Sequence, residues 1–259
     1  MTVRMGAVTV LLLVVGFLCV AGVASADPMR TILSKEYKFP DVNHAEFGTL
    51  FNYTSTDDKK DTLIDENREL YAVDPYVRYS LTEDLEVNAD IPFERVETTG
   101  RDETGIGDAS VGVDLVAYKD IFDYPYIMPH ATVTFDTGEK DKGLGGGDTY
   151  LTVGSVLGST VEDIYHFGVD VTYAIHENSD NIGAVAGSLI WDLNKKCSLV
   201  AEGKITDERD KTQDIDHPKT ILGGLWYKPT ESFNIGFYGG SEIDGPQDVI
   251  ADVKAAYSF

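Results

Sequence analysis

The chain has 259 residues, of which 42% are hydrophobic and 25% are charged, a composition that excludes a disordered polymer. Its formal net charge of −23 at pH 7 excludes nucleic acid as a partner, because phosphate binding needs a basic surface. Of its two cysteines, Cys19 lies in an N-terminal apolar run and Cys197 stands far from it. We therefore expect no disulfide to stabilise the secreted chain.

The first 26 residues have the pattern of a secretion signal. Arg4 precedes the apolar run "GAVTVLLLVVGFLCVAGVASA", which ends on the small residues Ala24 and Ala26. This pattern predicts a signal peptide over residues 1–26, with cleavage after Ala26. The alternative is an uncleaved anchor helix, because the run is almost long enough to span a bilayer. Loss of Arg4 with the signal would change the net charge from −23 to −24.

Residues 27–43 show no clean period, and we expect them to form an N-terminal periplasmic arm or a plug. From there to the end, over residues 44–259, segments of about ten residues alternate between apolar and polar side chains, as β-strands do. The predicted strands lie near residues 44–56, 68–80, 85–97, 107–119, 125–137, 149–159, 164–176, 182–193, 197–207, 219–229, 232–242 and 247–259.

The connections between these strands alternate in length. The short ones are "LTED", "DIFDY", "TVED", "NKK" and "TES"; the others, mostly longer and richer in charge and glycine, are "STDDKKDTLIDEN", "TGRDETGIG", "TGEKDKGLGGGD", "ENSDN" and "DERDKTQDIDHP". Short and long connections therefore lie at opposite ends, as in outer-membrane barrels with tight periplasmic turns. An even strand number also places the N-terminal arm and Phe259 on the same, periplasmic side.

The aromatic residues distinguish a membrane barrel from a soluble β-sandwich, since both architectures predict alternating faces. One group lies beside the short turns and comprises Tyr79, Tyr126, Tyr165, Trp191, Tyr227, Phe233, Tyr257 and Phe259. A second group lies toward the other end and comprises Tyr53, Tyr71, Phe93, Phe135 and Tyr173. Two such bands are typical of the two membrane interfaces. The sequence thus predicts an all-β, antiparallel, up-and-down transmembrane β-barrel of about twelve strands in the cell outer membrane.

The chain ends in "DVIADVKAAYSF", which is amphipathic only as a strand. This strand must close against the first one, because the hydrocarbon core tolerates no unpaired backbone. Tyr257 and Phe259 resemble the signal that the bacterial outer-membrane assembly machinery recognises. The alternative is an ordinary edge strand that happens to end in phenylalanine.

Three stretches carry a family resemblance: "YSLTEDLEVNADIPF", "GIGDASVGVDLVAYK" and "FDTGEKDKGLGGGDTYLTVG". In this order they resemble the motifs of outer-membrane proteins linked to meta-pathway phenol degradation, which are usually described as transporters. Asp136 stands where the family pattern has a proline before Thr-Gly. The resemblance implies a barrel that passes small molecules, aromatic or apolar ones among them, across the outer membrane.

The inward face is the predicted site of function. By phase it carries Asp74, Arg78, Glu86, Asn88, Asp90, Glu94, Asp114, His130, Asp136, His166, Asp170, Asp192, Glu202, Lys204, Asp252 and Lys254. One interpretation is a narrow aqueous path that favours cations or neutral solutes, because rings of carboxylates set charge selectivity. The other is that Arg78, Lys204 and Lys254 neutralise nearby carboxylates and stabilise a closed barrel.

Catalytic and metal-binding signals are weak. His130, His166 and His176 could each act as a base, and Ser155 and Ser188 are present, but no G-x-S-x-G motif occurs. The acidic loop with Asp207, Asp210, Asp214 and Asp216 lacks the spacing of a calcium site, and "GLGGGD" lacks the Lys-Ser or Lys-Thr of a phosphate loop.

We therefore expect no catalytic residue, metal or cofactor. The predicted function is a passive channel or transporter for small molecules; the alternatives are a structural or binding barrel with a closed lumen and an outer-membrane hydrolase. The expected partners are outer-membrane lipid and lipopolysaccharide, the assembly machinery and a small solute.

Overall fold

A computed structural model describes residues 29–57, 67–120, 125–207, 217–243 and 247–259. The predicted signal peptide, residues 1–26, lies outside the described residues. Within the described ranges, no helix combines the length and the apolar character needed to cross a membrane.

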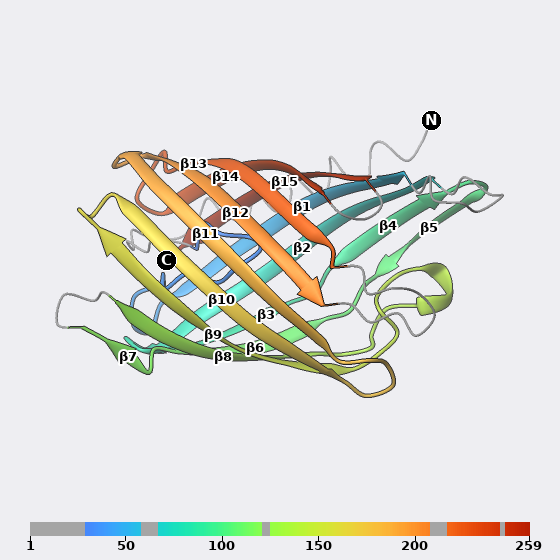
Figure 1. Ribbon diagram of the computed structural model, residues 1–259, viewed down its shortest axis with the longest axis horizontal. Coiled ribbons are helices and arrows are strands. Elements are labelled where there is room, and N and C mark those ends of the chain that lie inside the picture. Colours follow the sequence, from blue (N-terminus) through green and yellow to red (C-terminus); the bar gives the residue numbers. More distant parts are fainter. Residues whose placement is uncertain (1–28, 58–66, 121–124, 208–216, 244–246) are drawn as a thin grey trace.

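The described chain is almost entirely β-structure (Figure 1). Its strands are β1 (Ala45–Asp57), β2 (Asn67–Thr82), β3 (Leu85–Asp90), β4 (Phe93–Thr98), β5 (Arg101–Ile106), β6 (Ser110–Leu115), β7 (Tyr118–Lys119), β8 (Tyr126–Thr134), β9 (Tyr150–Val161), β10 (Tyr165–His176), β11 (Ile182–Asn194), β12 (Cys197–Asp207), β13 (Lys219–Tyr227), β14 (Phe233–Glu242) and β15 (Gln247–Ser258). Within the described ranges, the one short helix is the 3₁₀ turn η1 (Lys140–Lys142).

The strands form one antiparallel sheet that closes on itself, because β1 pairs with both β2 and β15. Two long strands are interrupted. β2 pairs first with β3 and then with β4, so these two segments occupy a single place in the wall. The segments β5, β6 and β7 likewise follow one another along the next strand. The result is the predicted closed barrel of twelve antiparallel strands.

The first interruption has a local cause, since Pro92 between β3 and β4 has no N–H to donate to the sheet. One loop prediction was wrong: residues 98–106 were assigned to a connection, but Arg101–Ile106 form β5, paired with β4. Gly100 has a φ of 88°. This left-handed conformation permits a tight hairpin turn, so the strand pair continues beyond the predicted boundary.

The outer surface of the barrel is apolar. Side chains such as Leu157, Val171 and Val249 are 57%, 53% and 57% exposed, and no second layer covers them in the described chain. A soluble sandwich would bury these residues, whereas a membrane barrel turns them to lipid. The alternation predicted from the sequence is therefore that of a membrane-spanning wall.

Aromatic rings gather toward both ends of this wall. At the short-turn end Phe47 stacks on Phe259 with a centroid distance of 5.2 Å, and Tyr165 stacks on Trp191 at 6.0 Å. At the other end Tyr53 contacts Tyr71 at 5.0 Å. These pairs occupy the positions expected of interfacial aromatic belts.

Tyr126 is an exception to the predicted belt, because its side chain points into the barrel and is only 4% exposed. It pairs across the sheet with Gly158, and a Cβ on that glycine would lie 2.1 Å from Cζ of the tyrosine. The glycine therefore leaves room for the ring to lie over the inner face of the neighbouring strand. The sequence prediction placed Tyr126 by its distance from a turn and missed this inward direction.

The two ends of the barrel differ, as the loop lengths predicted. At the end drawn on the left of Figure 1, β9 and β10 are joined through Glu162 and Asp163, whose φ angles of 54° and 55° make a tight turn. At the opposite end, residues 135–149 form a longer excursion that includes η1. By the rule for outer-membrane barrels, the short-turn end is periplasmic.

Candidate functional site

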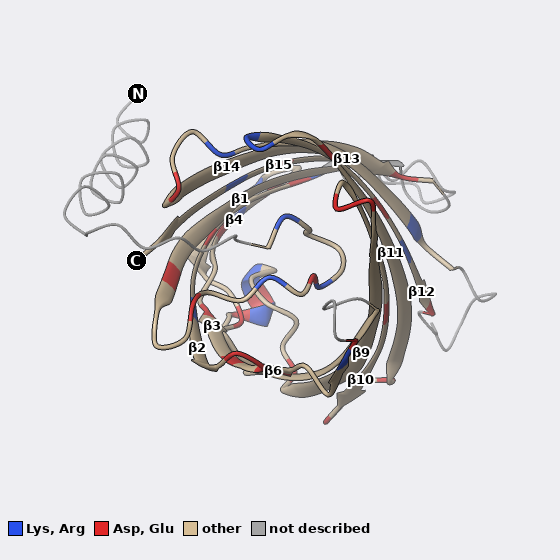
Figure 2. Cartoon of the chain, turned by 90° about the vertical axis from the view of Figure 1, so that its left-hand side faces the viewer, with Lys and Arg blue, Asp and Glu red and all other residues tan. Residues whose placement is uncertain are grey.

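Residues 29–44 are termed here the luminal segment. They run inside the barrel as far as residue 40 and are exposed at residues 41–43. Figure 2 looks into the short-turn end and shows non-strand chain within the ring of strands. Arg30, Thr31, Ser34 and Glu36 of this segment are all buried. Polar side chains of the inner wall hold it in place.

Glu202 on β12 makes the densest set of these contacts. Its carboxylate accepts hydrogen bonds from the backbone N–H groups of Ile32, Leu33 and Ser34 at 2.8, 3.0 and 3.1 Å. The hydroxyl of Ser34 donates a fourth bond at 3.1 Å. Successive backbone N–H groups that converge on one anion form a nest, so the segment is shaped around this carboxylate.

Arg30 forms a second anchor. Its guanidinium pairs with Glu36 at 2.7 Å and with Asp192 on β11 at 2.5 Å, and it also donates to Ser198 at 3.3 Å. Burial alone would raise the pKa of the Glu36 carboxyl, but the charge and hydrogen bonds of Arg30 outweigh it and hold the pKa below its ordinary value. Glu36 therefore stays ionised and fixes the fold of the segment.

Three further contacts tie the middle of the segment to the wall. The ammonium of Lys35 pairs with Asp114 on β6, and its backbone N–H donates to Asp170 on β10 at 3.1 Å. Asp170 in turn contacts Nε2 of His130 at 2.9 Å. The ammonium of Lys254 on β15 donates to the carbonyl of Thr31 at 3.2 Å. Bonds to widely separated strands thus hold the segment across the periplasmic half of the lumen.

The residues predicted to line the lumen fall into two groups. Those on the strands are buried or half-buried: Asp74, Arg78, Glu86, Asn88, Asp90, Glu94, Asp114, His130, His166, Asp170, Asp192, Glu202, Lys204, Asp252 and Lys254. Asp136 is exposed, because it follows the last residue of β8 and belongs to the external excursion.

Arg78 pairs with buried carboxylates, as expected if the inward cations neutralise nearby acids. It is 5% exposed and pairs with Glu46 at 3.2 Å and with Glu86 at 2.8 Å. It also donates to the carbonyl of Lys38, so this ion cluster reaches the luminal segment. In low-dielectric surroundings such pairing offsets much of the cost of burying the charges.

Beyond the luminal segment lies a cavity of about 280 Å³ with a different charge balance. The luminal segment forms part of its lining, and the charged lining groups are four carboxylates and three cations: Asp74, Glu86, Asp90, Asp114, Lys35, Arg78 and Lys254. Asp90 accepts a hydrogen bond from Ser110, whereas Oδ1 of Asp74 has no hydrogen-bond partner within the described chain. Oδ1 of Asp74 is therefore a buried acceptor in the wall of this cavity that no described group satisfies.

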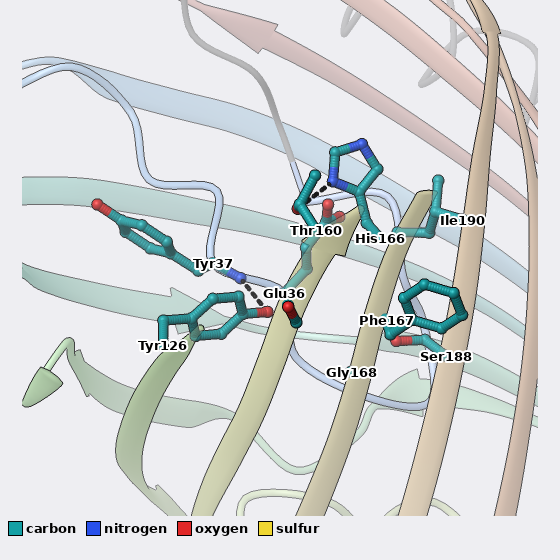
Figure 3. Close-up of a pocket in the computed structure, with 10 residues that line it drawn as sticks. Glu36, Tyr37, Tyr126, Thr160, His166, Phe167, Gly168, Ser188 and Ile190 are labelled. Atoms are coloured by element: carbon teal, nitrogen blue, oxygen red, sulfur yellow. Dashed lines mark hydrogen bonds between the residues drawn. The ribbon is translucent and has the colours of Figure 1, made fainter. Parts of the chain in front are cut away.

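His166 takes part in a chain of hydrogen bonds that superficially resembles a catalytic triad, and Figure 3 shows its contact with Thr160. Its Nδ1 lies 2.8 Å from Oγ1 of Thr160, and its Nε2 lies 2.8 Å from Oδ2 of Asp192. The adjacent cavity measures only about 10 Å³, which holds about one water molecule. Arg30 also occupies the other oxygen of Asp192. The arrangement therefore has no space for an ester or peptide substrate.

The other predicted polar groups give no further site. His176 contacts Asp148 at 3.1 Å near the outer rim, where Asp148 also accepts from the backbone of Asn178. Among the described residues, no group of three His, Cys, Asp or Glu side chains is placed to hold a metal ion. Asp210, Asp214 and Asp216 of the predicted acidic loop lie outside the described residues.

Sequence reasoning missed the luminal segment's contacts and the inward aromatic rings. The segment has no periodicity, but its basic residues Arg30, Lys35 and Lys38 complement an acidic lumen and could have indicated its place. Several of the inward rings could have been recognised by another feature, because a glycine lies opposite them on the next strand. Tyr76 lies opposite Gly48, as Tyr238 lies opposite Gly224.

The closed wall, the apolar exterior and the polar interior define an outer-membrane β-barrel protein. No family model and no curated protein matches the sequence. Among solved structures, the COG4313 outer membrane channel from Pseudomonas putida F1 is similar, with a TM-score of 0.75 at 13% identity over 86% of this chain and 98% of that one.

Two other solved structures share the architecture less closely. The KdgM porin has a TM-score of 0.57 at 10% identity, over 81% of this chain and 99% of that one. The CymD monoaromatic hydrocarbon channel has a TM-score of 0.52 at 8% identity, over 84% and 89%. At such identities the likenesses establish the fold.

Proposed function

We propose that the protein is an outer-membrane channel for small molecules and that the luminal segment closes its periplasmic half. The observation that carries this proposal is the nest of backbone N–H groups around Glu202, which holds the segment across the lumen. Apolar contacts add to it, since Ile32 packs against one small cluster on the wall and Tyr37 and Phe39 against another. The hydrogen bonds and ion pairs can be exchanged for bonds to water when the segment moves. A solute passes only when the segment moves.

The charge of the cavity of about 280 Å³ beside the luminal segment supports a preference among solutes. Of its lining charges, Lys35 pairs with Asp114 and Arg78 with Glu86, which leaves Asp74 and Asp90 against Lys254. Glu94 adds a carboxylate on the same inward face of the neighbouring segment. Carboxylates in a narrow lumen attract cations and repel anions. We therefore propose passage of cationic or neutral small molecules. The family resemblance and the name of the CymD monoaromatic hydrocarbon channel add aromatic compounds to this class.

A closed barrel with a structural or binding role is the second candidate. The bonds between the luminal segment and β6, β10, β11 and β12 favour it, because together they fill the periplasmic half. Under this hypothesis the segment never leaves. No catalytic role is proposed for His130, His166 or His176.

Conductance in planar bilayers separates the two candidates. We expect native protein to open rarely and a variant lacking residues 29–43 to conduct continuously. Because that deletion leaves buried carboxylates without partners, Glu202→Gln provides a milder test. The channel hypothesis fails if native protein and both variants pass no current and take up no solute, although each shows the circular dichroism of a folded barrel.

Selectivity provides a separate measurement. In a salt gradient, the reversal potential of the deletion variant should indicate a cation preference that Asp74→Asn with Asp90→Asn reduces. Glu177→Gln, on the exposed connection after β10, removes a carboxylate outside the lumen and serves as the control. An unchanged reversal potential in the double variant would exclude these carboxylates as the selectivity determinant.

Assembly of the barrel is proposed to depend on the outer-membrane assembly machinery, through Tyr257 and Phe259. The side chain of Phe259 is exposed beside Phe47 at the periplasmic rim. Lipid and lipopolysaccharide are the proposed partners of the apolar wall and of the outer rim.

A further inference from the structure

A second cavity, of about 290 Å³, lies at the periplasmic end of the barrel. Five cationic side chains line it: Arg30, Lys38, Lys195, Lys196 and Lys228. The whole chain has 21 Lys and Arg against 44 Asp and Glu, so this concentration of positive charge reverses the general balance. The single carboxylate in the lining is that of Asp192.

Asp192 does not neutralise the lysines, because its own partners already surround it. Its Oδ1 binds Arg30 at 2.5 Å and the hydroxyl of Ser198 at 2.6 Å, and its Oδ2 lies 2.8 Å from His166. The lining therefore holds five cationic side chains against one carboxylate, which Arg30 and His166 already contact.

The backbone fixes these lysines near one another. Lys195 and Lys196 form the turn between β11 and β12, and Lys228 directly follows β13. The backbone N–H of Lys228 donates to the carbonyl of Lys196 at 2.8 Å. The ammonium of Lys196 also donates to the carbonyl of Pro229 at 3.4 Å. Two adjacent periplasmic turns thus present their charges as one group.

Asn234 supplies an independent indication that this cavity holds a ligand. It lies on β14 on the inward face, it is 0% exposed, and it belongs to the lining. Within the described part of the chain, neither its Oδ1 nor its Nδ2 has a hydrogen-bond partner. Buried carboxamides are almost always paired, and an amide N–H is a donor that suits an oxyanion.

We propose that this cavity binds a small oxyanion, a carboxylate or phosphate group, that enters from the periplasm. The lysines of the two turns attract it, and the Nδ2 group of Asn234 donates a hydrogen bond to it. Such a group belongs either to a free solute or to the headgroup of a phospholipid in the inner leaflet. The site does not depend on whether the barrel conducts, so the two proposals are tested separately.

Tryptophan fluorescence of the full chain, purified in a non-ionic detergent, tests this site. Trp226 lines the cavity, and Trp191→Phe leaves it as the only tryptophan, since the chain has two. Sodium phosphate and sodium benzoate are titrated at constant ionic strength against sodium chloride. We expect a saturable change with phosphate or benzoate but not with chloride. A saturable change only in mixed micelles with phosphatidylglycerol would also support the site and would assign it to a lipid headgroup.

Matched variants decide whether the response belongs to this cavity. Lys195→Gln with Lys196→Gln should weaken binding at least tenfold, and Asn234→Asp should abolish it. Lys140→Gln with Lys142→Gln removes the same charge at the opposite end of the barrel and should leave binding unchanged. If Asn234→Asp does not fold, the exposed lysine pair still provides the test. The proposal is overturned if none of the anions gives a saturable change, or if both lysine pairs weaken binding equally.

Discussion

Replacement of Glu202 by glutamine should release the luminal segment while keeping the barrel intact. The carboxylate accepts four hydrogen bonds, three of them from the backbone of Ile32, Leu33 and Ser34. A hydrogen bond to a charged group contributes about 1.5–3 kcal/mol, and such contributions are not additive. Glutamine keeps one acceptor oxygen, so we expect a loss of about 3 kcal/mol in the free energy that holds the segment, which corresponds to about a 100-fold shift.

Hydrogen exchange of the native protein in detergent measures this shift directly. The amides of Ile32, Leu33 and Ser34 should exchange about 100-fold faster in Glu202→Gln, while the amides of β12 keep their native rates. Glu177→Gln is the control, because it removes an exposed carboxylate that does not contact the segment. Equal exchange at all three amides in Glu202→Gln and the native protein would refute the role of Glu202 as the anchor.

Gly48→Ala should lower the barrel's thermal unfolding temperature, measured by circular dichroism, because a Cβ there would lie 2.1 Å from Cζ of Tyr76. The expected cost is about 1–3 kcal/mol, and an unchanged temperature would contradict it. Deletion of Phe259 should slow insertion into the outer membrane, measured by pulse-chase fractionation, and native kinetics would refute its role. Arg30 holds the pKa of the Glu36 carboxyl below its ordinary value of 4.5. The pairing therefore stabilises the folded segment fully above pH 4.5, and this stabilisation is lost as the pH falls through the lowered pKa of the folded protein. Channel opening should therefore rise in acid, and Glu36→Gln should remove part of this pH dependence.

Strand positions could be predicted because the membrane imposes a strict pattern. Every spanning strand must alternate lipid-facing and lumen-facing residues, and every turn must interrupt that alternation. Segments such as Tyr165–His176 therefore have the predicted limits to within one residue. The prediction failed at Arg101–Ile106, where a hairpin extends beyond the apolar wall and its charged residues no longer follow the lipid pattern.

The interior could be predicted less well, since alternation assigns a side chain to a face but not to a partner. The phase placed Glu202 and Asp170 inside the barrel, yet nothing in it indicated that both bind the backbone of residues 32–35. Those residues have no period of their own, because they form neither a strand nor a helix. In the sequence, the only feature that connects the luminal segment with the wall is charge: Arg30 and Lys35 are basic, whereas the inward face of the wall is mostly acidic.

This charge complementarity gives the luminal segment a double role. The wall places Asp114, Asp192 and Glu202 in the interior, where unpaired carboxylates are costly, and Arg30 and Lys35 compensate two of them. Removing the whole segment would therefore open the lumen and at the same time destabilise the barrel that surrounds it. A substitution at one anchor separates the effects better, because it weakens the hold on the segment while Arg30 and Lys35 remain present to pair with Asp192 and Asp114. Under the proposed function, closure and stability depend on the same ion pairs, and a solute that opens the lumen must provide bonds to replace them.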